Sequence, residues 1–488
     1  MENKIAFAKG AQVSTVNASD RLCSVVQPFV QEIFNSLLEL KNFRQAILQA
    51  AHKHQKIADR FFDIDPNQVE TSFSLKKEFL LLENNPVLAL LFNNARYPAF
   101  LGKSGLVNLQ DQGILPDIKK LLYLCGQSQH TYSQISQQIG DGGNLLLDKW
   151  IKCRIVEEKP GSHDINEAEN SQNSPGVVRL QHASLLYRTK TTGVLVDPHL
   201  HSNYGIPSLK KDITRAQLEG LVDAILISHS HYDHWHCPTL MMFPADIPII
   251  VPKVPQGTIT CEDMEARLKS LGFENVIAVD WYADPIIFGD IEIHVLPFYG
   301  EQPLVPEYDR PKYPELRNWG NTYLIRTEYY TSWFLIDAGN EPTASMVEVA
   351  EYVKQKFADV DQIISNFQPL SYNSIGTDLS SWGIDIVGNL ISNPQIFSVT
   401  NQQEGEYIAT LGPKGVAEIC AIVGAKFCLP YAHSWAELGT YTTNDERLMV
   451  QTQEELNKLG CSTKVIPWRI GDGSVSQDNQ TICHPVFN

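Results

Sequence analysis

The stretch ILISHSHYDHWH, which ends at His236, carries four histidines and one aspartate in its last eight residues. Imidazole and carboxylate groups together suit zinc or iron. His229 and His231 are two residues apart, so in an extended chain they point the same way and can bind one ion. Asp233 and His234 follow where the chain turns, and they can bind a second, adjacent ion. The spacing predicts a two-metal site, although one histidine alone would more often be solvated or hydrogen-bonded in the core.

The elements around this motif are predicted to bring it to the edge of a sheet. The apolar run LVDAILIS, directly before the histidines, predicts a strand buried on both faces. The carboxyl end of such a strand is a common position for the active site of an α/β protein. A helix is expected to begin near Pro238. His236 is expected either to contact a metal ligand without binding the metal itself or to be exposed, and it is not included among the ligands.

From residue 177 onward, short β-branched or aromatic runs alternate with helical patterns. GVLVDP, IPIIVP and SWFLIDAG are typical of strands, whereas CEDMEARLKSLG and ASMVEVAEYVKQKF are typical of helices. This alternation predicts a layered α/β domain in which helices cover the faces of the sheets.

The motif HSHYDH resembles the signature of the metallo-β-lactamase superfamily. HASLLYRTKTTGVLVDP also resembles the opening strands of that superfamily, which end in an aspartate, here Asp197. The resemblance covers about residues 177 to 470 and implies an αββα sandwich. It also implies that Asp337 in WFLIDAGN bridges two metal ions and that His433 in FCLPYAHSW is the last ligand. Asp197 is expected to have a structural or outer-shell role.

One position departs from the hydrolases of that superfamily, which usually have a ligand histidine after the strand IEIHVLP. This sequence continues as FYGEQPL, where Glu301 is the only ionisable ligand. Glu301 is either a surface residue, in which case the site lacks one ligand, or it completes a two-histidine, one-carboxylate set with His229 and His231. That set is typical of non-haem iron oxygenases, and zinc has no redox chemistry. The second ion would then have Asp233, His234 and His433, with Asp337 shared.

This sequence resembles the di-iron β-hydroxylases of nonribosomal peptide biosynthesis, of the chloramphenicol-pathway type. Those enzymes have the same replacement of the ligand histidine by a glutamate. The resemblance implies two iron ions (Fe2+/Fe3+), O2 as co-substrate and an external electron donor of unknown identity. It implies catalytic roles for Glu301 and Asp337. It also implies two partners: an aminoacyl carrier protein of a nonribosomal peptide synthetase, and an electron donor protein or other reductant.

The chain is predicted to have two parts joined by a polar linker at residues 161–176. Residues 1–160 are read as a mainly helical N-terminal domain, and LKKEFLLLENNPVLALLF within it is expected to continue the helical pattern. Its last 50 residues resemble a winged-helix unit; the alternative is a small helical packing domain through which a homodimer forms. Residues 177–488 are expected to be the metallo-β-lactamase-like catalytic domain.

Composition limits the possible functions of this 488-residue chain. Hydrophobic residues make up 43% and charged residues 19%, as in ordinary globular proteins. The net charge is −17, divided into +2 for residues 1–160 and −19 for the remainder, which argues against nucleic-acid binding. The 9 cysteines are scattered without a CxxC pair. No signal peptide or membrane-spanning run is recognised, so a cytoplasmic protein without membrane contact is expected.

Two other functions are consistent with parts of this pattern. The first is a dinuclear zinc hydrolase of the same fold, which would cleave an ester, lactone or phosphodiester with a metal-bound hydroxide. The second is a DNA-binding regulator with a winged-helix-like front end, which the near-neutral charge of residues 1–160 disfavours.

Overall fold

The computed structural model of the chain describes most of its residues. The described residues are 3–8, 10–40, 43–65, 67, 74–80, 87–94, 105–109, 113–160, 175–181, 183–200, 213–231, 233–258, 261–300, 318–341, 344–357, 359–371, 408–432, 443–477 and 480–486. The predicted linker at residues 161–176 lies almost entirely outside them. None of the described helices is long and apolar enough to cross a bilayer.

The first of two large sheets contains eight strands. In spatial order they are β13 (Val276–Val279), β12 (Ile249–Pro252), β11 (Ala224–Leu226), β10 (Gly193–Val196), β9 (Leu185–Arg188), β8 (Gly176–Arg179), β25 (Asp472–Gln477) and β26 (Gln480–Pro485). The strands from β10 to β13 are parallel to one another. The carboxyl ends of β10 and β11 therefore lie at the same edge of the sheet.

The second large sheet contains seven strands. In spatial order they are β14 (Ile286–Phe288), β15 (Ile291–Pro297), β16 (Asn321–Arg326), β17 (Thr331–Ile336), β20 (Gln362–Asn366), β23 (Phe427–Tyr431) and β24 (Lys464–Val465). β17, β20, β23 and β24 are parallel. Separate two-stranded sheets are formed by β18 (Asn340–Glu341) with β19 (Ala344–Ser345) and by β21 (Leu370–Ser371) with β22 (Ile408–Thr410).

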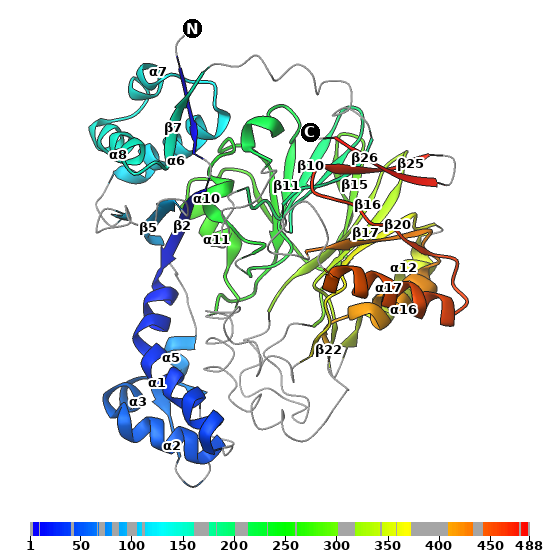
Figure 1. The fold of residues 1–488 in the computed structure, drawn as a ribbon, viewed down its shortest axis with the longest axis horizontal. Helices are drawn as coiled ribbons and strands as arrows, with labels where there is room; N and C mark the ends of the chain where they lie inside the picture. Colours follow the sequence, from blue (N-terminus) through cyan, green and yellow to red (C-terminus); the bar gives the residue numbers. More distant parts are fainter. Residues whose placement is uncertain are drawn as a thin grey trace.

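The two sheets pack face to face, with helices outside, which confirms the predicted αββα sandwich. One hydrophobic cluster joins the inner faces of both sheets to the helices on the second sheet, which are α12 (Met346–Lys356), α16 (Gly412–Val423) and α17 (Thr443–Lys458). A second cluster lies on the other face of the first sheet, under η2 (Arg215–Leu218), α10 (Cys237–Leu240) and α11 (Met264–Ser270). In Figure 1, α12, α16 and α17 lie on the opposite side of the molecule from the N-terminal elements.

The N-terminal part consists mainly of helices with several short strands. The helices are α1 (Ala18–Leu40), α2 (Phe43–Lys53), α3 (Gln55–Phe61), α5 (Lys77–Leu80), α6 (Ile114–Gln127), α7 (Tyr132–Ser136) and α8 (Asp141–Lys152). The strands are β1 (Lys4–Phe7), β2 (Ala11–Asn17), β3 (Phe62–Asp63), β4 (Ser74–Leu75), β5 (Val87–Asn94), β6 (Leu106–Asn108) and β7 (Val156–Lys159). After α6, α7 and α8, β7 pairs with β1 from the start of the chain. The winged-helix-like domain and its boundaries remain a prediction.

One expected helix is a strand. The sequence from Val87 was expected to continue a helical pattern, but it forms β5, which pairs with β2 over its whole length and with β6. Pro86 lacks the backbone N–H that a helix interior needs, so a helix cannot pass through it without losing a hydrogen bond. Beyond it, Phe92 is buried and Leu91 is 45% exposed, as in a strand with one covered face.

Candidate metal centre

The histidine-rich loop begins where β11 ends, as the sequence predicts. Residues of β11 alternate between the two hydrophobic clusters, with Leu226 in the first and Ile225 in the second. The strand is therefore buried on both faces, and its direction fixes where the loop starts. His229 and His234 both emerge from this loop into the interior between the sheets, and each is fully buried.

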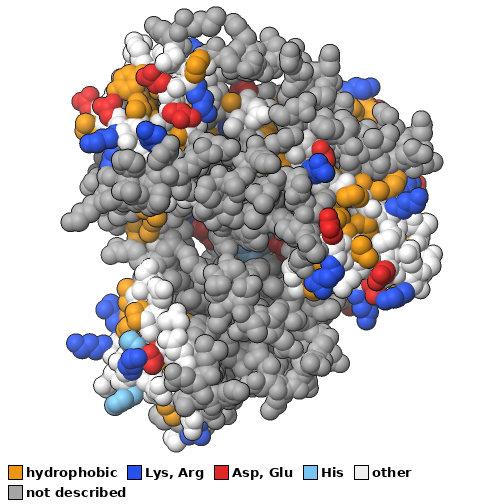
Figure 2. Space-filling view, viewed as in Figure 1, with side chains coloured by type: hydrophobic (Ala, Val, Ile, Leu, Met, Phe, Trp, Pro, Cys, Tyr) orange, Lys and Arg blue, Asp and Glu red, His pale blue; other side chains and the backbone are white. Residues whose placement is uncertain are grey.

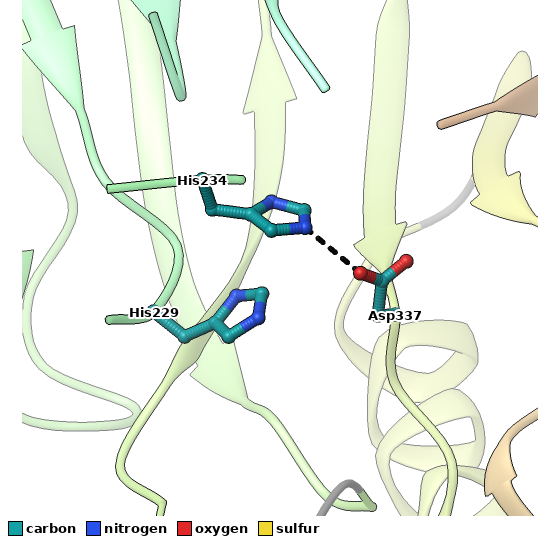
Figure 3. A group of neighbouring side chains, drawn as sticks. All are labelled: His229, His234 and Asp337. Carbon is teal, nitrogen blue, oxygen red and sulfur yellow. Dashed lines mark hydrogen bonds and ion pairs between the residues drawn. The ribbon is translucent and has the colours of Figure 1, made fainter. Parts of the chain in front are cut away.

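Three side chains converge at this position, as Figure 3 shows. Ligand atoms of His229, His234 and Asp337 all lie within 4.8 Å of one another. Nε2 of His234 donates a hydrogen bond of 2.8 Å to Oδ2 of Asp337. Asp337 directly follows the carboxyl end of β17 in the second sheet and is 5% exposed. The site is thus assembled from the facing edges of both sheets.

Asp197 supports His234 from the other side. It follows the carboxyl end of β10, and its Oδ2 accepts a hydrogen bond of 2.9 Å from Nδ1 of His234. It also accepts hydrogen bonds from the backbone N–H and the hydroxyl of Ser228, at 2.7 and 2.5 Å. Burial raises the pKa of Asp197, and these hydrogen bonds oppose that shift. The outer-shell role expected for Asp197 agrees with these contacts, because its carboxylate fixes the ring orientation of His234.

The electrostatics of the two histidines differ. Burial opposes protonation of His234, but the carboxylates of Asp233, Asp337 and Asp197 outweigh it and raise its pKa well above the usual value. Burial lowers the pKa of His229 well below the usual value, and His234 adds to that shift. The lowered pKa of His229 favours the neutral form, which is the form that binds a metal ion, whereas the carboxylates around His234 favour a positive charge at that position.

The other two predicted loop ligands lie beside this group. The His231 ring is 4.5 Å from the His229 ring, and its Nε2 lies 3.1 Å from Nδ2 of Asn318. Oδ2 of Asp233 lies 3.4 Å from Nε2 of His234. The structure thus brings both side chains to the edge of the three-residue group. Metal binding by them remains a prediction.

Glu301 and His433 lie outside the described residues, and so do residues 302–317. The described chain before Glu301 ends at Gly300, whose N–H donates to Oε1 of Glu341 at 3.3 Å. The backbone O of Tyr299 also accepts from the N–H of Gly339 at 2.6 Å. The described chain before His433 ends at the carboxyl end of β23, where the Tyr431 ring lies 6.4 Å from that of His234. Both chain segments therefore reach the edge of the site.

Three non-glycine residues with left-handed backbone lie around the site. The φ angles of Asp197, Ile336 and Ala432 are 45°, 60° and 53°. A β-branched residue such as Ile336 rarely adopts this conformation, which costs about 1–3 kcal/mol. Each of the three directly follows or ends a strand at the site. These strained turns redirect the chain from the sheet edges, and Ile336 does so immediately before Asp337.

Several residues that contact the group were missed by the sequence reasoning. Nδ2 of Asn366 donates to Oδ1 of Asp337 at 2.8 Å. Asn366 ends the parallel strand β20, so its position at the carboxyl end of a predicted strand could have identified it from the sequence. Ser228 ends the run LVDAILIS and so lay at the same kind of position, whereas Asn318 gave no such signal, because its contact with His231 depends on packing. His236, which was not included among the ligands, points away and caps α10.

The donor set fits a bound cation. Three carboxylates, those of Asp197, Asp233 and Asp337, are at most 8% exposed and surround one imidazole. Burial of like charges is costly unless a positive charge compensates them. A metal ion held by His229, His234 and Asp337 would supply that charge. Figure 2 shows acidic and histidine side chains recessed near the middle of one face of the molecule.

The chain was compared with protein-family models and with known proteins. No protein-family model matches the chain. It is 28% identical over 241 residues to a 4-amino-L-phenylalanyl-(CmlP-peptidyl-carrier-protein) 3-hydroxylase of Streptomyces venezuelae, a match over 49% of this chain. The matched part spans 40% of the length of that relative.

Two solved structures have the same fold along nearly the whole chain. One is CmlA, a diiron β-hydroxylase from Streptomyces venezuelae, with a TM-score of 0.56, 15% identity and coverage of 99% of this chain and 100% of that chain. The other is a point mutant of the CmlA β-hydroxylase, with a TM-score of 0.56, 16% identity and coverage of 96% and 99%. These matches confirm the predicted fold.

Proposed function

We propose that the chain is an O2-dependent di-iron monooxygenase, which hydroxylates the β-carbon of an amino acid tethered to a carrier protein of a nonribosomal peptide synthetase. The observation that carries this proposal is the buried group of His229, His234 and Asp337, which lies in a fold shared with CmlA along 99% of the chain. Sequence similarity to a hydroxylase named for a peptidyl-carrier-protein substrate supports the same class of reaction.

In the proposed reaction, a C–H bond of the substrate becomes a C–OH bond. One oxygen atom of O2 enters the product and the other leaves as water, and two external electrons and two protons balance the change. The two iron ions, when bound, supply the redox chemistry that this reaction needs. The electron donor is proposed to be a separate protein or reductant.

We assign seven metal ligands. The first ion would have His229, His231 and Glu301, the second would have Asp233, His234 and His433, and Asp337 would be shared. The hydrogen bond that Nδ1 of His234 donates to Asp197 supports this assignment, because it leaves Nε2 facing Asp337. For Glu301 and His433 the support is the resemblance and the path of the described chain up to Gly300 and Ala432.

The surrounding residues orient the ligands and keep water away. The Ser228 hydroxyl lies 2.9 Å from Nδ1 of His229, so Nε2 of that ring is directed to the metal position. The ring of Phe298 stacks on His229 with 4.9 Å between centroids and covers one face of it. A dry site of this kind favours hydrogen abstraction from the positioned substrate over side reactions with water.

The carrier protein is proposed to dock on a part of this chain that is not acidic. The region after residue 160 has a net charge of −19, and carrier proteins are often acidic as well, so their surfaces would repel. The near-neutral residues 1–160 are one candidate surface. The other is the basic segment with Arg310 and Lys312, which lies outside the described residues. A homodimer formed through residues 1–160 remains a prediction.

Metal analysis and one substitution test the function. We expect about two iron ions per chain in freshly purified protein, and one added oxygen atom, by mass spectrometry, on the carrier-bound amino acid. Glu301→Ala should lower iron content and reduce turnover by at least about 100-fold, the upper end of losses from outer-shell changes. Glu348→Ala, at an exposed position on α12, is the matched control and should change neither.

Two outcomes would contradict the proposal. Stoichiometric zinc without iron, together with cleavage of an ester, lactone or phosphodiester, would indicate the dinuclear zinc hydrolase instead. Unchanged metal content and turnover in Glu301→Ala would remove the oxygenase assignment whatever the metal.

A further inference from the structure

The loop that carries the predicted ligands is tied at two points to a strand of the N-terminal part of the chain. We propose that β2 positions this loop, with Asn17 and His236 as positioning residues that act on the metal centre through it. The proposal rests on the proposed function only in requiring that the site holds a metal ion. It assigns to residues 1–160 a role in the metal centre itself.

The first tie runs through a buried ion pair. Glu262 receives a hydrogen bond of 2.9 Å from the indole N–H of Trp235, and its backbone N–H donates to Oγ of Ser230 at 3.1 Å. Both contacts are to the ligand loop. The Glu262 carboxylate also pairs with Arg267, which is 4% exposed. Nη1 of Arg267 then donates to Oδ1 of Asn17 at 2.9 Å, at the end of β2.

The second tie is made by His236 at the far end of the loop. Its Nε2 lies 2.9 Å from the backbone O of Val13, so this nitrogen must carry the proton and donate it. Nδ1 is then the acceptor, and it receives the backbone N–H of Thr239 at 3.2 Å. The imidazole therefore joins β2 to the first turn of α10, which directly follows the loop.

The two ties enclose the ligands. His231, Asp233 and His234 lie between Ser230 and His236. His236 contacts β2 directly, and Ser230 is linked to β2 through Glu262, Arg267 and Asn17. The strand β2 is itself held along its length by β5. A metal site requires its ligands to be held in place by packing and outer hydrogen bonds. The N-terminal part provides that support from outside the catalytic sheets.

A pair of substitutions at Asn17 separates this role from general stability. Asn17 directly precedes α1, where serine and aspartate cap a helix as well as asparagine does. Asn17→Ser keeps a cap but is too short to reach Arg267, whereas Asn17→Asp keeps the acceptor oxygen. The full-length protein is loaded with Co2+ alone, and metal loss to excess chelator is followed by the visible absorption of the bound ion.

We expect Asn17→Ser to release Co2+ roughly tenfold faster, the lower end of losses from outer-shell changes, and Asn17→Asp to stay near the wild type. Lys119→Met is the matched control, because Nζ of Lys119 bonds the backbone O of Leu271 and Gly272 and so joins the same two parts away from the loop. It should lower the melting temperature without faster metal release. His236→Leu tests the second tie and should also speed release.

Release at the wild-type rate in both Asn17→Ser and His236→Leu would overturn the inference, and so would equally fast release in Lys119→Met. A wild-type protein that binds no Co2+ would overturn the proposed function as well. Conversely, the expected release rates in a protein that does not hydroxylate a carrier-bound amino acid would leave the positioning role intact and remove only the proposed reaction.

Discussion

Gly320 packs closely against two residues of the candidate site, Phe298 and His229. A Cβ atom there would lie 2.8 Å from Cδ1 of Phe298 and 3.1 Å from Cβ of His229. The backbone O of Gly320 also accepts a hydrogen bond of 2.7 Å from the indole of Trp281. The backbone N–H of the next residue, Asn321, donates to the backbone O of Ser228 at 2.8 Å. The backbone is therefore held in place here, so a side chain at Gly320 could fit only if Phe298 or His229 moved.

We predict that Gly320→Ala destabilises the protein by about 1–3 kcal/mol, as overpacking of a core typically does. Because His229 is one of the groups displaced, metal affinity should fall as well. Urea unfolding and Co2+ titration measure the two effects. Gly142→Ala in helix α8 is the control, because the nearest atom of another element to a Cβ there is Cδ1 of Ile114, at 3.8 Å. Equal metal affinity in both variants would show that Phe298 yields without moving His229.

At the scale of elements, β11 determines where the site is built. It lies between β10 and β12, and its residues face both hydrophobic clusters alternately. A strand buried on both faces has one register, because a shift of one residue would exchange the two clusters. The position of the ligand loop at its end is therefore fixed by packing and does not depend on the metal.

We predict that Ile225→Ala in β11 costs about 2–5 kcal/mol, the usual loss for a large side chain in a core. Ile277→Ala in the edge strand β13 of the same sheet should cost under about 1 kcal/mol, because Ile277 is 40% exposed. Chemical unfolding of both metal-free variants gives the comparison. Similar losses at the two positions would mean that β11 is less tightly packed than its burial indicates.

At the scale of the whole molecule, the N-terminal part shares a hydrophobic core with the catalytic sheets. One cluster contains Val13, Leu121 and Trp150 together with Ile225 and residues of α10 and α11. The two-part organisation along the sequence therefore does not correspond to two separate cores. Part of the outer face of the first sheet is therefore covered by residues that precede its first strand, β8, in the sequence.

We predict a single cooperative unfolding transition for the full chain, and aggregation of a fragment containing only residues 177–488, whose outer sheet face would be exposed. Coincident far- and near-ultraviolet circular dichroism curves and a calorimetric enthalpy equal to the van't Hoff value would agree with this. Two well-separated transitions, or a soluble folded fragment, would contradict the shared core.

The resemblance to a known superfamily implied the αββα sandwich. The sequence pattern by itself determined the alternation of strands and helices, the buried strand before the histidines and the loop of His229, His231, Asp233 and His234. These features are local, because alternation of apolar residues and the spacing of ligands depend only on neighbours along the chain. It did not determine β5, where a helical pattern was expected, since pairing with β2 outweighed local propensity.

Only the tertiary structure decided which distant groups meet. Asp337 reaches His234 across 103 positions, and His236 reaches Val13 across 223. Such contacts depend on the order of strands in two sheets and on how the N-terminal part packs against them. No periodicity in the sequence encodes that order, because it is set by the burial of whole faces at once.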